Sequence, residues 1–218
     1  MRLITKFIFL SILIPIYSNS TELDVNQNSL KMNVGYMSEY WARGSFQAAS
    51  VFYTDINYIS GPIVLSGRLA DLSDRSGGDL FLALNGNYNF TLSSIPVYVG
   101  VGAYRYKNGL DYHYNEISVG ADFNLFSVDT VVLGDYNTNP STDYWHFQIT
   151  VPLGLVDYKY GSYSGVWQYT FHEISYKKNF NNIYIGFNLG VNNDNAMGDA
   201  KNSNQDTEYG ILSIGYTF

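Results

Sequence analysis

The stretch EYGILSIGYTF, residues 208–218, decides the fold class because it alternates large apolar side chains with a second set at every other position. One set consists of Leu212, Ile214, Tyr216 and Phe218, and the other of Ile211, Ser213, Gly215 and Thr217. Successive side chains of a β-strand point to opposite faces, so the alternation predicts a strand with one apolar face. Such a strand needs partners along both edges, which a closed barrel supplies by pairing the last strand with the first.

The composition favours a surface that is shared between lipid and water. Charged residues make up 14% of the 218-residue chain and aromatic residues 17%, including 21 Tyr. Typical soluble domains contain about 25% charged residues. The mean hydropathy is nevertheless slightly negative, as expected when apolar and polar faces alternate in a membrane barrel. The chain has no Cys, which excludes a small disulfide scaffold.

The first twenty residues have the pattern of a secretory signal peptide. Arg2 and Lys6 precede an apolar run over 7–17, and small residues follow at Ser18 and Ser20. The run is shorter than the ~20 apolar residues of a membrane-spanning helix, the alternative interpretation. We therefore expect 1–20 to be removed and 21–218 to form one domain.

The charge balance argues against a nucleic-acid partner. The chain contains 12 Lys and Arg against 19 Asp and Glu. Without Arg2 and Lys6, ten basic residues face nineteen acidic ones, a net charge of about −9. Proteins that bind nucleic acid need clustered positive charge, so we expect no such partner.

Period-2 segments recur along the whole mature chain and predict about twelve strands in an all-β, closed antiparallel transmembrane barrel. Links after even-numbered strands are tight, as in SGP at 60–62 and LSSI at 92–95, whereas links after odd-numbered strands are longer and more polar, as at 71–79 and 192–207. This sidedness is typical of bacterial outer-membrane barrels. The expected strands are 30–40, 47–59, 62–71, 79–90, 95–106, 111–125, 128–136, 143–152, 154–161, 166–178, 182–191 and 208–218.

A soluble barrel of the lipocalin type is the main structural alternative, because it shows the same period with its apolar face inside. The strand expected at 79–90 distinguishes the two. It sets Leu80, Leu82 and Leu84 against Phe81, Ala83, Asn85, Asn87 and Asn89. Three Asn on one dry inner face would need complete hydrogen bonding, whereas water in a lumen satisfies them. We therefore expect the leucines to face lipid.

Residues 36–47, YMSEYWARGSFQ, resemble the first-strand signature of an uncharacterised proteobacterial family of proposed porins labelled TorF. The matching residues are Tyr36, Ser38, Glu39, Tyr40, Arg43, Gly44 and Gln47, and YTFHEISYKKNF at 169–180 is similar to a late strand of that family. The resemblance implies an outer-membrane barrel with a pore and brings no catalytic residues. The alternating set from Leu212 to Phe218 also resembles the C-terminal signal by which the barrel assembly machinery recognises its substrates.

Ionisable residues on the predicted inward faces are the candidates for a selectivity site. Arg or Lys facing lipid at mid-depth costs roughly 2–4 kcal/mol, which favours an inward position. Such residues either pair and hold the barrel in shape or select permeating ions. The candidates are Glu39, Arg43, Asp55, Arg68, Glu116, Asp122, Asp157, Lys159, Glu173 and Lys177. We expect Glu116, Asp122 and Glu173 to lie mid-strand and to act on ions.

Catalysis and metal binding are weaker hypotheses. A Ser nucleophile needs an oriented His, yet His113 in LDYHYNE has no Ser motif beside it, and we expect His146 and His172 to be wall residues bonded to Tyr neighbours. The acidic loop 192–207 lacks the ligand spacing of an EF-hand. We expect neither enzyme activity nor a bound metal or cofactor.

Together these patterns predict a porin of a Gram-negative outer membrane, in contact with outer-membrane lipid and passing small hydrophilic solutes with a weak cation preference. The preference follows from six acids against four bases on the inward faces. A closed barrel that is structural or binds through its surface loops is the alternative, and a lipid-modifying enzyme or protease is a third, weaker one.

Overall fold

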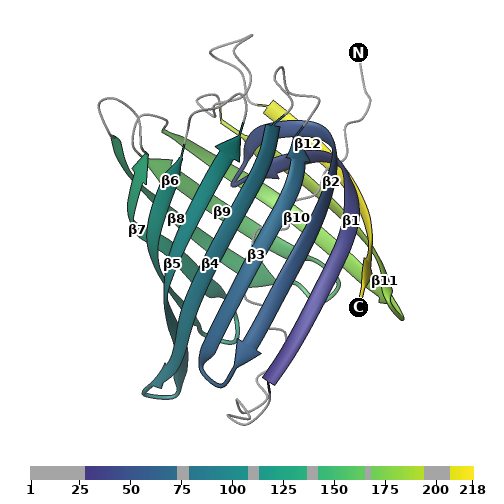
Figure 1. Ribbon diagram of the computed structural model, residues 1–218. Helices are drawn as coiled ribbons and strands as arrows, with labels where there is room; N and C mark the ends of the chain where they lie inside the picture. The colour runs from purple at the N-terminus through teal and green to yellow at the C-terminus, as the bar shows by residue number, and fades with distance from the viewer. Residues whose placement is uncertain (1–27, 73–78, 108–112, 137–141, 165–167, 194–206) are drawn as a thin grey trace.

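The computed structural model describes residues 28–72, 79–107, 113–136, 142–164, 168–193 and 207–218 (Figure 1). These residues form twelve strands and no helix. Among them, no helix is long and apolar enough to cross a membrane. The strands are β1 (Asn28–Ala42), β2 (Ser45–Ser60), β3 (Ile63–Leu72), β4 (Asp79–Leu92), β5 (Ile95–Lys107), β6 (Tyr114–Asp122), β7 (Ser127–Tyr136), β8 (Thr142–Pro152), β9 (Asp157–Ser164), β10 (Tyr169–Phe180), β11 (Ile183–Asn192) and β12 (Thr207–Thr217).

Each strand pairs antiparallel with its neighbours, and β12 pairs with β1 to close the barrel. The register at the closure runs from Asn33 opposite Thr217 to Met37 opposite Ser213. The predicted all-β, closed antiparallel barrel is confirmed. Its strand expected at 154–161 is shifted, because residues 153–156 form a turn and β9 begins at Asp157. The expected signal peptide and the acidic residues Asp194, Asp199 and Asp206 lie outside the described residues.

Tight turns connect the strands at one rim of the barrel. The β4–β5 link consists of Ser93 and Ser94, both with positive φ, and such two-residue turns match the twist of the flanking strands. The β8–β9 link is closed by a hydrogen bond of 2.8 Å from the Leu153 amide to the Val156 carbonyl. At the other rim, four of the remaining connections are longer, as expected, and lie partly outside the described residues.

The outer surface is apolar and the inner surface is polar and aromatic. On β12, Leu212 is 52% exposed and Ile214 is 50% exposed, whereas Ile211 and Ser213 between them are buried. On β4, Leu82 faces outward and Asn89 inward, as predicted. Many tyrosines lie inside, where their rings pack together and their hydroxyls form hydrogen bonds. This facing excludes the lipocalin-type alternative and fits a barrel in the outer membrane of a Gram-negative bacterium.

Candidate functional site

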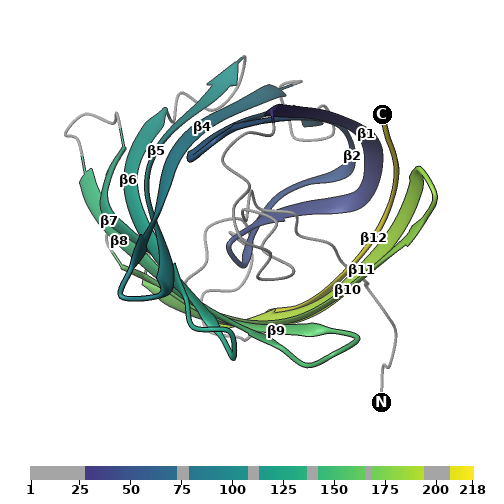
Figure 2. The same ribbon diagram turned by 90° about the horizontal axis from the view of Figure 1, so that it is seen from below.

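The far end of the β1–β2 hairpin leaves the barrel wall and bends into the lumen (Figure 2). Pairing of β1 with β12 stops at Met37, and pairing of β2 with β3 begins only at Tyr53. Residues 38–52 therefore have strand partners only within the β1–β2 hairpin among the described residues. Ser50, with φ of 57°, and a register shift after Tyr40 mark the bend.

The hairpin ends in a two-residue turn, Arg43–Gly44, whose φ angles of 53° and 76° are both positive. This link was expected to be long, like the others at its rim, but it is tight because Ala42 pairs directly with Ser45. A Cβ at Gly44 would lie 2.6 Å from the Phe171 Cβ. Glycine therefore provides both the backbone conformation and the close approach to β10.

Side chains of the hairpin contact the opposite wall of the barrel. Arg43 donates two hydrogen bonds to the Glu116 carboxylate on β6, one of them 2.8 Å from Nη2 to Oε2. The Asn192 side chain on β11 donates to the Gly44 carbonyl. Arg43 and Glu116 are 73 positions apart in the chain. The turn is therefore held by contacts with two parts of the barrel wall, β6 and β11.

Aromatic packing fixes the rest of the hairpin. The Trp41 ring stacks on Tyr209 of β12, with centroids 4.3 Å apart. The Tyr106 hydroxyl on β5 donates to Gln47 Oε1 at 3.0 Å. Most of the residues that matched the TorF-type signature therefore belong to this inward hairpin. The sequence did not predict its position.

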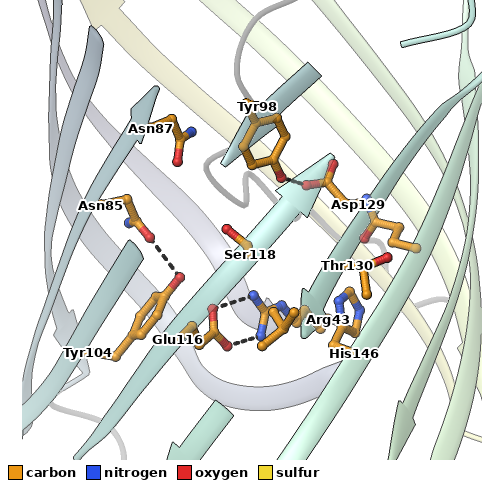
Figure 3. A pocket seen from close by; sticks show the side chains of 12 residues that line it. Arg43, Asn85, Asn87, Tyr98, Tyr104, Glu116, Ser118, Asp129, Thr130 and His146 are labelled. Atoms are coloured by element: carbon orange, nitrogen blue, oxygen red, sulfur yellow. Dashed lines mark hydrogen bonds and ion pairs between the residues drawn. The ribbon is translucent and has the colours of Figure 1, made fainter. Parts of the chain in front are cut away.

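A polar pocket lies between the turn and the wall formed by β4–β8 (Figure 3). Its volume is about 550 Å³, part of which is open to solvent. Tyr98 donates to the Asp129 carboxylate, and Tyr104 donates to Asn85 Oδ1 at 2.9 Å. Arg43 contributes the only cationic side chain among the lining residues. The pocket therefore offers amide, hydroxyl and carboxylate groups to a solute.

Two further ion pairs join neighbouring strands inside the barrel. Arg68 on β3 donates to the Asp55 carboxylate on β2 at 2.7 Å and 2.8 Å, and its guanidinium lies 4.8 Å from the centroid of the Tyr53 ring. Lys159 on β9 lies 2.8 Å from Glu173 on β10. Six of the ten candidate residues thus form three pairs, so much of the predicted inward charge is neutralised locally.

Two other candidates have aromatic partners. Glu39 accepts a hydrogen bond of 2.9 Å from Trp41 Nε1. The Lys177 ammonium lies 4.1 Å from the centroid of the Tyr184 ring, which stabilises a cation by its quadrupole. Lys177 is the one candidate cation without a carboxylate partner among the described ion pairs.

The last two candidates lie at strand ends. Asp122 is the final residue of β6, and its carboxylate accepts the Asn124 amide at 2.8 Å. The prediction that Asp122 lies mid-strand is therefore wrong, because the chain turns directly after it. Asp157 begins β9 and is exposed. Glu116 and Glu173 do lie mid-strand, but both are buried in ion pairs.

Asp129 is a charged residue of the pocket lining that the sequence did not predict. Val132 and Leu133 on β7 are both exposed on the lipid side, and the register with β8 shifts there. This bulge reverses the alternation, so that Val131 and Asp129 face inward. Among the described residues, no ion pair involves Asp129.

The three histidines form no catalytic arrangement among the described residues. His172 bonds to the Tyr158 hydroxyl at 2.7 Å, as expected. His146 was also expected to bond to Tyr, but its Nε2 has no partner and its ring packs near Phe171. His113 accepts the Tyr106 amide at 3.4 Å. In the same residues, no group of His, Cys, Asp and Glu could hold a metal ion.

Solved structures with a similar fold include outer-membrane porins. The KdgM porin aligns with a TM-score of 0.56 over 86% of this chain and 99% of its own, at 11% identity. The KdgM porin in complex with disordered oligogalacturonate aligns with a TM-score of 0.54 over 86% and 99%, at 10% identity. At these identities the likeness shows the fold. A scan against protein-family models and a search of curated proteins both find no match, so the TorF-type resemblance stays a prediction.

Proposed function

We propose that the protein is an outer-membrane pore that passes small hydrophilic solutes by passive diffusion. The pocket between the β1–β2 turn and the β4–β8 wall is the observation that supports this function most directly. It is lined by groups that replace the hydrogen bonds of a hydrated solute, and it lies beside an inward segment that narrows the lumen.

The expected cation preference is part of this proposal. Three lumen carboxylates are paired with cations, which leaves Glu39, Asp122, Asp129 and Asp157 against Lys177 among the charges considered. The surplus of negative charge is small, so the preference should be weak and should decrease with salt.

The ligand of the KdgM complex is not transferred to this chain. Oligogalacturonate is a carboxylate, and its binding requires cations that are free to meet it. Arg43, Arg68 and Lys159 are all held by carboxylates. A neutral or weakly cationic solute fits these charges better.

A closed barrel that acts structurally or through its surface loops is the second candidate. The observation that favours it is the hairpin, which crosses the lumen and contacts β6 and β11. A variant in which a short Asn-Gly turn replaces residues 38–52 distinguishes a pore from a closed barrel, because its removal of the hairpin would start conductance only if the hairpin closes the native lumen. Under both, outer-membrane lipid and the barrel assembly machinery are the expected partners.

Conductance in planar lipid bilayers tests the proposal. The purified barrel should conduct potassium chloride, and liposomes containing it should swell in small neutral solutes. Folded protein that inserts without conducting would overturn the pore function. A truncated hairpin that then conducts would show that the hairpin closes the native lumen.

A further inference from the structure

We propose that the pocket beside Arg43 is a binding subsite for a neutral polyhydroxylated solute, a sugar in chemical class. The inference rests on the proposed pore function and specifies the solute that the pore would recognise. It is based on three properties of the pocket: its charge, its unused hydrogen-bonding atoms and its aromatic lining.

The charges of the pocket disfavour an anionic solute. Its single cation, Arg43, is bound by both oxygens of Glu116, and the Tyr144 hydroxyl donates to the same carboxylate at 2.7 Å. Asp129 remains as a carboxylate without an ion-pair partner among the described residues. A sugar acid would therefore meet an unpaired negative charge and no free positive one.

The pocket offers both hydrogen-bond donors and hydrogen-bond acceptors. Asn85 Nδ2 has no hydrogen-bond partner, because Tyr104 engages only Oδ1 of that side chain. His146 is 3% exposed, and its Nε2 also lacks a partner. Asp129 can only accept when ionised. Buried polar groups in folded proteins are normally satisfied, so these atoms suit a ligand that supplies the missing bonds.

Hydroxyl groups match this mixture better than charged groups do. A hydroxyl donates to Asp129 and also accepts from Asn85, whereas an ammonium only donates and a carboxylate only accepts. Figure 3 shows Asn85 and Asp129 on different sides of the pocket, with Ser118 between them in this view. A solute that contacts both therefore needs hydroxyls at more than one position, as in a sugar.

The lining of the pocket supports a small ligand. Tyr98 and Tyr104 provide aromatic surface beside the polar groups, a combination that is common in small-molecule sites. Arg43 forms one side, so the inward hairpin helps to build the site.

Two measurements test the subsite, and the first of them does not depend on conductance. Saturation-transfer NMR on the intact barrel in lauryldimethylamine oxide micelles, a detergent without a sugar headgroup, should detect millimolar binding of sucrose or maltose. Galacturonate and spermine should bind at least tenfold more weakly. In bilayers, the same neutral sugars should block the current with a matching concentration dependence.

Variants locate the binding. Asn85→Ala and Asp129→Asn should each weaken sugar binding about threefold to tenfold, the loss of one hydrogen bond. Asn57→Ala is the matched control, because Asn57 is an amide on the inward positions of β2 outside the pocket lining. Its sugar binding should equal that of the native protein.

The outcomes separate this inference from the proposed pore. A barrel that binds sugar in micelles but does not conduct would overturn the pore and leave the subsite standing. A barrel that conducts without sugar binding or current block would overturn the subsite alone. Equal or tighter binding of galacturonate or spermine, or an equal loss in Asn57→Ala, would also overturn it.

Discussion

The Arg43–Glu116 ion pair should control whether the hairpin stays docked in the lumen, and Arg43→Asn tests this. Asn accepts positive φ readily, so it keeps the turn with Gly44 while it removes the guanidinium. The Glu116 side chain, which is 3% exposed, then keeps hydrogen bonds from tyrosine hydroxyls, among them that of Tyr144 at 2.7 Å.

The expected loss can be worked out from this geometry. Removing one partner of a buried ion pair costs about 3–5 kcal/mol. Relief of the left-handed strain at position 43 returns about 1 kcal/mol, and pocket water can solvate part of the freed carboxylate. We expect docking to weaken by about 2 kcal/mol, which is roughly a 30-fold change in the opening equilibrium.

Hydrogen–deuterium exchange of the folded barrel measures that equilibrium. Amides of residues 38–52 should exchange roughly 30-fold faster in Arg43→Asn, whereas the wall strands β7–β11 should not change. Glu116→Gln combined with Arg43→Asn leaves no unpaired charge and should recover part of the protection. Unchanged exchange in the hairpin, or faster exchange throughout the barrel, would refute the reasoning.

Three further predictions concern the turn, the lipid face and the lumen charge. Gly44→Ala should impair folding, because the added Cβ would clash with Phe171 and the backbone φ would be strained. Gly154→Ala is the control, because its Cβ meets nothing within 4 Å and only the φ strain remains. Heat-modifiable gel migration should show a larger loss of folded barrel for Gly44→Ala. Leu82→Arg and Ile149→Arg place a charge on the lipid face and should lower barrel stability by about 2–4 kcal/mol, the cost at the lipid midplane. Asn85→Arg and Gln148→Arg place it on the inner face and should lower stability less. Equal folding yields of all four variants in vesicles would contradict the assigned facing. Replacing Glu116, Asp122 and Glu173 by their amides should shift the reversal potential in the direction of anion selectivity, because Arg43 and Lys159 lose their carboxylate partners. The shift should shrink between 0.1 M and 1 M salt as the Debye length falls from about 10 Å to about 3 Å. The absence of a shift at low salt would contradict a role of these acids in ion selectivity.

Local alternation explains why the strands and their facing were predictable. On β4 and β12 the side-chain direction follows from position alone, so the outward Leu82 and Leu212 could be assigned before any tertiary structure was known. On β7 the same rule fails, because a bulge at Val132–Leu133 changes which side Asp129 faces. A bulge depends on the register with both neighbours, and a single strand contains no information about that register.

The ion pairs show a similar limit. The inward positions of Asp55, Arg68 and Glu173 follow from alternation, but their partners follow from strand register. Asp55 lies opposite Arg68, and Glu173 opposite Lys159, because of the turns that join β2 to β3 and the pairing of β9 with β10. The predicted charge surplus was therefore larger than the unpaired charge that the structure leaves in the lumen.

The sequence by itself determined the barrel class, the approximate strand positions, the apolar lipid face and the polar interior, because all of these depend on a two-residue period and on turn chemistry. Only the tertiary structure decided that residues 38–52 turn inward, that Arg43 meets Glu116 and that Asp129 faces the pocket. These features arise from contacts between segments far apart in the chain. Their geometry exists only once β12 has paired with β1 and the barrel has closed.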